Sequence, residues 1–432
     1  MDRRNFLGLS VLAGLTAGVS PVARRLLEAQ PMPPSSSPEA YTGRFFLMIN
    51  AGGGWDPTML CDPKGGDINR GFMASQIRSA GELRYAPVDY NVNGTTFSNQ
   101  RFFEKYADRL LVLNGIDMQT NNHDTGTRYT WSGHMEDGYP PLAAIVAASL
   151  APGRPLGFLS NGGYENTAGI VPLARLTDIN VIARIAYPNR SDPANASSRY
   201  HSDTTMSRIQ RYQRERLTAM HAAQTLAPFE VSTRQLLATR GGANLLEGLM
   251  ARLPDTATIN RSNNPIYRQG IVALAAYQAG VTAAANLSIG GFDTHGQHDM
   301  NQGNALGNLL IGVDLLMDRI DALGLTDRVT VVIGSDFGRT PGYNAQMGKD
   351  HWSVTSMLAM GAGVRGGRVV GATNESFRAR GLDFGTLMPS DTATTKLNPK
   401  SIHMALRRLA GVERSDVARS FPIVGDAIDV FS

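Results

Sequence analysis

The chain has 432 residues, of which 42% are hydrophobic and 18% are charged. These proportions are typical of a globular protein, and the length suits one large α/β domain or two ordinary domains. The formal net charge of +4 is small, and no run of lysine or arginine is dense enough to indicate binding to nucleic acid. Cys61 is the only cysteine, which excludes an intrachain disulfide, so stability must come from a hydrophobic core.

Residues 1–40 predict an export signal followed by a linker. The pair Arg3-Arg4 precedes an uncharged run, residues 7–22, that is too short and too weakly apolar to span a membrane. The Arg-Arg-x-Phe-Leu arrangement resembles a twin-arginine signal, although Asp2 replaces the usual Ser or Thr before the pair. Residues 30–39, rich in Pro and Ser, are typical of a linker. We therefore expect export by the twin-arginine machinery to the periplasm or the medium; a disordered basic tail is the alternative. No other stretch predicts a transmembrane segment.

The rest of the chain, residues 41–432, alternates strand-like and helix-like segments. Residues 304–323 place leucine, valine and isoleucine at helical spacing between two strand-like runs, and such a strand–helix–strand unit favours a parallel sheet. The Arg- and Gln-rich segment at about residues 190–265 predicts a helical insertion that covers one side of the sheet, with its charges on a solvated face. Continuous apolar runs predict buried strands at residues 44–50, 110–114, 157–160, 284–289 and 328–335, and shorter strands are expected at residues 356–361 and 368–370. Further helices are expected at residues 99–106, 140–150, 206–226, 271–280 and 402–409.

Acidic and histidine side chains follow several of the expected strands. Asp56 comes shortly after three glycines, which let the backbone turn sharply and direct its amides at an anion. Asp293 and His295 follow the strand that precedes the long helix, Asp336 ends the strand after it, and Asp350-His351 follows fourteen residues later. Because ligands bind beyond the carboxyl ends of the strands in parallel α/β sheets, we expect these side chains to converge on one site.

Asp and His together suit a divalent cation, and we predict zinc, manganese or calcium as the cofactor. His298 is a candidate for a further ligand or a substrate contact, and Arg339 could bind an oxyanion in a bidentate manner. The alternative is that these side chains cap helices and form hydrogen bonds with one another, with Asp56 in an Asx turn or at a helix N-cap. The expected metal ligands are Asp56, Asp293, His295, Asp336 and His351.

Two further segments bear on function. Residues 121–131 place several uncharged polar side chains at a junction between an expected strand and a helix, which favours binding; a helix N-cap with surface polar residues is the alternative. The run Cys61-Asp62-Pro63-Lys64 resembles the sulfatase maturation motif Cys-x-Pro-x-Arg, but it has Lys for Arg and lies only five residues after Asp56. We interpret it as a turn.

Three motifs in the second half resemble the family named domain of unknown function 1501. They are Gly-Gly-Phe-Asp-Thr-His at residues 290–295, Ser-Asp-Phe-Gly-Arg-Thr at residues 335–340 and Asp-His at residues 350–351. With the twin-arginine start, the resemblance covers most of the chain. That family is similar in fold to the alkaline phosphatase and sulfatase superfamily, which implies an alkaline-phosphatase-like α/β/α sandwich around a mostly parallel sheet.

The resemblance also assigns roles to single residues. It places Asp56 at the metal ligand after the first strand and Asp293 and His295 at the central Asp–His pair, with a shorter spacing than in phosphatases. Asp336 matches the next metal-binding Asp, and His351 matches the final ligand His.

The sequence departs from the family pattern at two places. Phe337 stands where phosphatases have His directly after the second Asp, and Asn122-His123 stands where the family usually has Ser-His. The candidate catalytic residues are therefore Thr125 as a substitute nucleophile, His123, and Arg339 on the oxyanion.

Two functions are consistent with this pattern. The first is an exported, metal-dependent hydrolase of phosphate or sulfate esters carried by a small molecule or a polymer, in which Thr125 or a metal-bound water attacks. The second is a non-catalytic periplasmic binding or assembly protein that keeps the fold. The Asp and His side chains at strand ends favour the first, whereas the missing His after Asp336 and the lack of a defined nucleophile favour the second.

Overall fold

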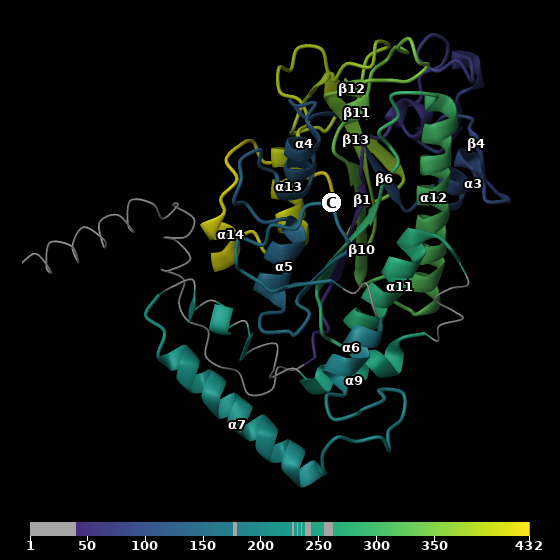
Figure 1. Ribbon diagram of the computed structural model, residues 1–432. Coiled ribbons are helices and arrows are strands. Elements are labelled where there is room, and N and C mark those ends of the chain that lie inside the picture. Colours follow the sequence, from purple (N-terminus) through teal and green to yellow (C-terminus); the bar gives the residue numbers. More distant parts are fainter. Residues whose placement is uncertain are drawn as a thin grey trace, which may run out of the picture.

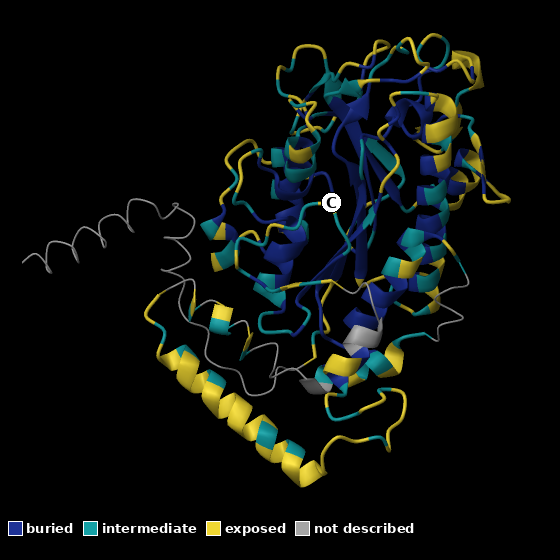
Figure 2. Cartoon of the chain, in the orientation of Figure 1, coloured by how far each residue is buried: buried dark blue, intermediate teal, exposed yellow. Residues whose placement is uncertain are grey.

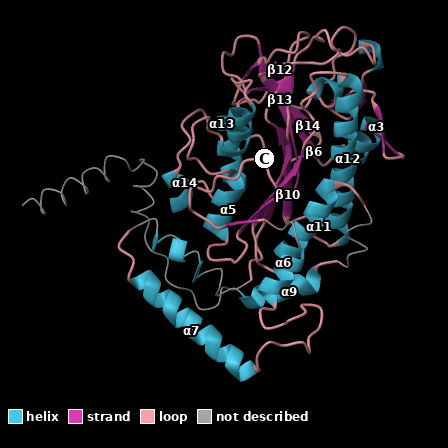
Figure 3. Ribbon diagram, viewed as in Figure 1, coloured by secondary structure: helices cyan, strands magenta, loops and turns pink. Residues whose placement is uncertain are grey.

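The computed structural model describes residues 40–175, 179–226, 229–230, 232–234, 236–237, 243–254 and 262–431. The export signal expected in residues 1–40 therefore lies, apart from residue 40, outside the described residues. Figure 1 shows a central sheet with helices on both of its faces, and Figure 3 shows the strands running through the middle of the molecule.

The central sheet has eight described strands in the order β14-β6-β13-β10-β1-β9-β7-β8. β1 (Phe45–Ala51) lies between β9 (Ala284–Ile289) and β10 (Val329–Ser335) and is parallel to both. β13 (Val354–Gly361) is antiparallel to β10 and to β6 (Leu110–Asp117), and it is the one strand of these eight that runs against the rest. The expected mostly parallel sheet is confirmed. The other strands are β7 (Phe158–Ser160), β8 (Leu173–Ala174) and β14 (Arg368–Val370).

Alternate side chains of β1 enter two hydrophobic cores, one on each face of the sheet. Phe45, Leu47 and Ile49 belong to one core, and Phe46 and Met48 belong to the other. All seven residues of β1 are buried, as expected of a central strand covered on both faces. Helices of the first core are α3 (Asn99–Lys105), α11 (Pro265–Gln278) and α12 (His298–Ala322), and those of the second are α4 (His123–Ser132), α5 (Leu142–Leu150), α13 (Pro399–Leu409) and α14 (Asp416–Ser420). The protein is therefore an α/β/α sandwich.

The expected strands and helices are present, with shifted ends. The largest shifts are in α11 and α12, which begin at Pro265 and His298, each six residues before the expected start at residues 271 and 304. In α12 the reason is visible in the sequence. Its first turns are polar, and two of these polar side chains, His298 and Gln302, are fully buried, so the apolar pattern begins later than the helix. The remaining short elements are η1 (Pro57–Met59), η2 (Ala74–Gln76), β2 (Arg78–Ala80), β3 (Leu83–Tyr85), β4 (Asp89–Val92), β5 (Thr95–Ser98), β11 (Gly338–Arg339), β12 (His351–Trp352), β15 (Gly381–Leu382) and β16 (Pro389–Ser390).

The segment expected as a helical insertion, about residues 190–265, contains α7 (Asp203–Ala222) and α9 (Ala243–Arg252). α9 packs against α6 (Ile179–Ala186) and α11. No residue of α7 is buried, and Figure 2 shows this helix exposed along its length and standing away from the sheet. The expectation that the insertion covers one side of the sheet is thus wrong for α7. None of the described helices is long and apolar enough to cross a membrane.

Candidate metal centre

The carboxyl edge of the sheet gathers polar side chains around Asp336, the residue that follows β10. Asp336 is almost fully buried, and its Oδ1 accepts hydrogen bonds from the backbone amides of Gly53 and Gly54 at 2.9 and 2.8 Å. Gly53 has φ +118°, and a Cβ there would lie 2.5 Å from the backbone nitrogen of Asp293, so this turn requires glycine. The glycine loop after β1 does direct its amides at an anion, and that anion is a carboxylate of the protein itself.

The second oxygen of Asp336 holds His123 in place. His123 Nδ1 lies 2.5 Å from Asp336 Oδ2, and this hydrogen bond raises the pKa of His123 above its ordinary value. His123 is the first residue of α4, whose N-cap is Asn122. Gly126 lets α4 approach this closely, because a Cβ at this position would lie 2.4 Å from the backbone oxygen of Asp336.

Three imidazoles converge on one oxygen of Asp293, which follows β9. Asp293 Oδ1 lies 3.0 Å from His295 Nε2, 3.3 Å from His351 Nε2 and 3.6 Å from His123 Nε2. His295 Nε2 and His351 Nε2 lie 3.0 Å apart, and the ligand atoms of His123, Asp293 and His351 all lie within 4.8 Å of one another. The structure thus brings together Asp293, His295 and His351, as expected, and adds His123.

Each of these imidazoles has its other ring nitrogen engaged by an acceptor. His123 Nδ1 faces Asp336, His295 Nδ1 lies 3.0 Å from Asp350 Oδ1, and His351 Nδ1 lies 2.8 Å from the backbone oxygen of Asn121. Metal-binding histidines usually donate their second ring N–H in this way, which fixes the tautomer and turns the free lone pair toward the metal. The roles of Asp350 and Asn121 are not predictable from the sequence, because a backbone oxygen carries no residue-type signal and Asp350 stands out only as the neighbour of His351.

The ligand atoms of His123, Asp293 and His351 have the spacing of a divalent-cation site, and His295 Nε2 lies 3.0 Å from both Asp293 Oδ1 and His351 Nε2. When the imidazoles are neutral and protonated at Nδ1, three nitrogen lone pairs and a carboxylate oxygen face one another, and they repel unless a cation or a shared proton lies among them. Bonds of about 2.1 Å place neighbouring ligand atoms of tetrahedral zinc about 3.4 Å apart. The distances of 3.0 to 3.6 Å between Asp293 Oδ1 and the imidazole nitrogens are close to that value.

The local charge also favours a divalent cation. The imidazoles are surrounded by three carboxylates and one guanidinium, which touch the imidazoles or each other. These groups belong to Asp293, Asp336, Asp350 and Arg339. With neutral imidazoles this group carries a net charge of −2. Burial alone would raise the pKa of Asp293, but its hydrogen bond and ion pair with Arg339 lower it below the usual value, so Asp293 is ionised at neutral pH.

Phe337 occupies the position where phosphatases have His, and it orients the imidazoles by packing. Its ring centre lies 4.7 Å from that of His123 and 4.5 Å from that of His351. Phe337 is fully buried, so these two imidazoles have an apolar wall on one side. The cluster therefore obtains its third imidazole from the N-terminus of α4 rather than from the residue after Asp336.

Asp56, expected as a metal ligand, and His298, a candidate for a further ligand or a substrate contact, lie instead in a separate buried network. Asp56 Oδ2 lies 2.6 Å from Lys349 Nζ and 2.9 Å from His298 Nε2, and all three side chains are fully buried. Asp56 also caps η1 by accepting from the amide of Thr58 at 2.9 Å. Burial by itself raises the pKa of Asp56, but the ammonium of Lys349 and the hydrogen bond from His298 hold it well below its usual range. The cation beside Asp56 is therefore the ammonium of Lys349, and the fully buried His298 contacts Asp56 and Thr294.

Arg339 and Thr125 are also placed differently from the expectation. The guanidinium of Arg339 is fully buried and donates to Gly54 O at 2.8 Å, to Lys349 O at 3.0 Å, to Gly53 O and to Asp293 Oδ1 at 2.6 Å. It acts as a clamp between loops rather than as a free oxyanion binder. Thr125 follows His123 by two residues on α4, and side chains two residues apart on a helix face different directions.

Residues 46–404 match the family described as "Protein of unknown function (DUF1501)". The chain belongs to this family. No curated protein matches the DUF1501 chain.

Several solved structures are similar in fold to this DUF1501 protein at low identity. The lipoteichoic acid synthase LtaP from Listeria monocytogenes is 8% identical, with 94% of this chain and 81% of that chain covered and a TM-score of 0.39. A protein in the alkaline phosphatase superfamily from Vibrio parahaemolyticus is 10% identical, with 95% and 77% covered and a TM-score of 0.34. The i-CgsB protein in complex with neocarrahexaose is 8% identical, with 90% and 76% covered and a TM-score of 0.38. These similarities concern the fold alone.

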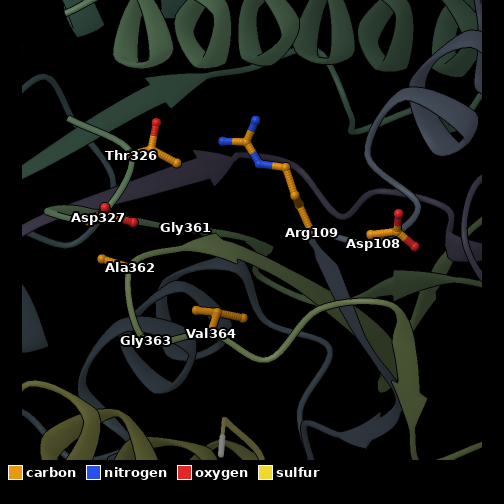
Figure 4. A pocket seen from close by; sticks show the side chains of 8 residues that line it. All are labelled: Asp108, Arg109, Thr326, Asp327, Gly361, Ala362, Gly363 and Val364. Carbon is orange, nitrogen blue, oxygen red and sulfur yellow. The ribbon is translucent and has the colours of Figure 1, made fainter. Parts of the chain in front are cut away.

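Two other features of the DUF1501 protein do not belong to the cluster. Cys61 is buried in a turn, as expected, with its Sγ 3.8 Å from Asn114 Oδ1. Figure 4 shows a pocket of about 240 Å³ that is lined by residues including Arg109 and Thr326. It lies where β6 and β10 begin, at the opposite edge of the sheet from the imidazoles. Arg109 is already paired with Asp321 at 2.7 Å, so we assign no ligand to this pocket.

The buried ion pair predicts a pH-dependent loss of stability in one variant. Asp56→Asn leaves the Lys349 ammonium buried without a counter-charge and should lower the free energy of unfolding at pH 7 by about 3–5 kcal/mol. Because the folded pKa of Asp56 is depressed, its stabilisation is complete above the ordinary Asp pKa of about 3.9 and is lost as the pH falls further. The difference between wild type and variant should therefore stay constant above about pH 5 and shrink as the pH falls below about 4 in urea unfolding.

Exposed Asp67 provides the control for this experiment. Asp67→Asn should change the free energy of unfolding by less than about 0.5 kcal/mol at either pH. Equal stability of wild type and Asp56→Asn at pH 7 would refute the role assigned to the ion pair.

Proposed function

We propose that this DUF1501 protein is a metal-dependent hydrolase of phosphate or sulfate esters. One divalent cation would be held by His123, Asp293, His295 and His351. The observation that carries the proposal is the convergence of three imidazole Nε2 atoms on Asp293 Oδ1, each imidazole having its Nδ1 engaged by an acceptor. Zinc or manganese suits three imidazoles better than calcium, which prefers oxygen ligands.

The chemistry divides between the cation and the residues that hold it. When bound, such a cation supplies a water that loses its proton near neutral pH and a positive charge for an ester oxygen. Asp336 and Asp350 orient two of the imidazoles, and Arg339 fixes the carboxylate of Asp293. Asp293 and His295 are each about half exposed, so the cluster is open on one side to an ester group of a small molecule or of a polymer.

Water is the nucleophile in this proposal, in place of Thr125. Among the described residues, no Ser, Thr or Tyr hydroxyl forms a hydrogen bond with the four ligand side chains. The same observation favours the second candidate, a non-catalytic binding or assembly protein that holds a metal without turning over an ester.

We also propose that the protein is exported by the twin-arginine machinery to the periplasm or the medium, because Arg3-Arg4 precedes a short apolar run. Replacing both arginines with lysine should leave the protein in the cytoplasm, as measured by cell fractionation. Unchanged export of that variant would contradict the assignment.

The metal site predicts the behaviour of two variants. Asp336→Asn preserves the size of the side chain but removes the charge that faces His123, and it should weaken metal binding by about 10- to 100-fold. His123→Ala removes a ligand and should reduce hydrolysis of phosphate or sulfate esters by at least about a hundredfold. Metal content after dialysis, melting temperature and turnover on a panel of esters are measured on the same zinc- or manganese-loaded samples.

His201→Ala provides a matched control, because His201 is exposed and lies in the insertion. This variant should bind metal and hydrolyse esters as the wild type does. Wild-type protein that binds metal without turnover on any ester would rule out the hydrolase and leave the binding protein. Wild-type protein that binds no zinc or manganese would rule out the site itself.

A further inference from the structure

Positive charge and exposed apolar side chains are both concentrated in the insertion. Residues 190–265 contain ten arginines and six acidic residues, a net charge of +4, which equals the net charge of the whole chain, so the remaining residues are neutral on balance. Among the described residues, six of the thirteen exposed large apolar side chains lie between residues 190 and 265, and two more, Leu173 and Ile185, lie shortly before them. Scattered apolar residues on a surface are ordinary, but a cluster that coincides with the excess charge indicates an interaction surface.

The helix α7 combines the two features along 20 residues. Ile209, Tyr212, Arg216 and Met220 follow one another at spacings of three and four, so they share one side of the helix. Tyr212 is 62% and Met220 is 42% exposed. A long Arg side chain within such a line can lay its methylene groups along the apolar surface while its charge reaches water or a phosphate group. The helix carries Arg208, Arg211, Arg214 and Arg216 against two carboxylates, Asp203 and Glu215.

We propose that α7 docks this protein onto an anionic lipid surface. A helix with an apolar line and several arginines lies in the plane of a membrane interface, with its apolar side chains between the headgroups. Each arginine near an anionic surface strengthens binding about fivefold. A single helix that stands away from the body needs no matching groove on its partner, which suits a lipid surface better than a protein. A second copy of α7 is disfavoured, because two helices that are each net positive repel each other.

The position of α7 determines which way the metal centre faces when the protein is docked on lipid. Figure 1 shows α7 at one end of the molecule and β11 and β12, which carry Arg339 and His351, at the other. Docked through α7, the protein would direct its four-residue cluster away from the lipid and toward solvent. The proposal holds whether or not the cluster hydrolyses an ester.

Vesicle binding of the full chain tests the proposal. Co-sedimentation is measured with vesicles made of equal parts phosphatidylglycerol and phosphatidylcholine, and with phosphatidylcholine alone, at low and high salt. The variant in which Arg208, Arg211, Arg214 and Arg216 are changed to Gln should bind the anionic vesicles at least about tenfold more weakly than the wild type. A double variant, Tyr212→Ser with Met220→Ser, should also bind more weakly, because the apolar line is lost.

In the matched control, four exposed arginines outside the insertion are changed to Gln. They are Arg84, Arg268, Arg378 and Arg414. This control has the same net charge as the α7 variant and the same first 39 residues. Its affinity for anionic vesicles should fall by less than about threefold, because only long-range charge is lost. Unchanged melting temperatures show that both variants are folded.

Three outcomes of the binding measurements would overturn the proposal. They are an absence of wild-type binding to anionic vesicles at low salt, an equal loss of binding in the two four-arginine variants, and a preference for heparin or polyglutamate over the vesicles. A wild-type dimer in sedimentation that the α7 variant abolishes would also overturn it, in favour of contact between copies.

Discussion

The buried carboxylate of Asp336 is the contact on which the candidate site depends. It joins the glycine loop after β1, the end of β10 and the first residue of α4, because it accepts from two backbone amides and from His123. A buried carboxylate is costly unless donors surround it, and these donors lie 213 to 283 residues away from Asp336 in the chain. The same contact that stabilises the charge therefore fixes the imidazole that completes the cluster.

Two further constraints keep the loops beside this contact. Arg339 clamps the glycine loop to the segment that contains Lys349, and Lys349 is tied in turn to Asp56. The backbone amide of Lys349 donates to the oxygen of Thr294 at 3.1 Å, so the chain that carries His295 lies beside the chain that carries His351. Asp56 and Arg339 thus support the site by holding its loops, while four other residues face its open side.

The sequence predicts the fold better than it predicts the role of each site residue. Continuous apolar runs identify buried strands such as β1 and β10, because a central strand covered on both faces has no polar side. The rule that sites form beyond the carboxyl ends of strands locates the cluster, because it depends on topology alone. The role of a site residue such as Asp56 depends on which side chain lies opposite it in the folded protein. Its partner Lys349 lies 293 residues away, and no local pattern records that pairing. The antiparallel direction of β13 was likewise not visible in its apolar run, which suits either direction.

The central claim is that three imidazoles and Asp293 bind one divalent cation, and X-ray absorption spectroscopy tests it directly. The spectrum of the zinc-loaded full-length protein should show one zinc with three imidazole ligands and one or two oxygen ligands at about 2.0–2.1 Å. In His123→Ala the imidazole contribution should fall to two. A zinc environment with one imidazole or none, or an unchanged spectrum in His123→Ala, would contradict the account.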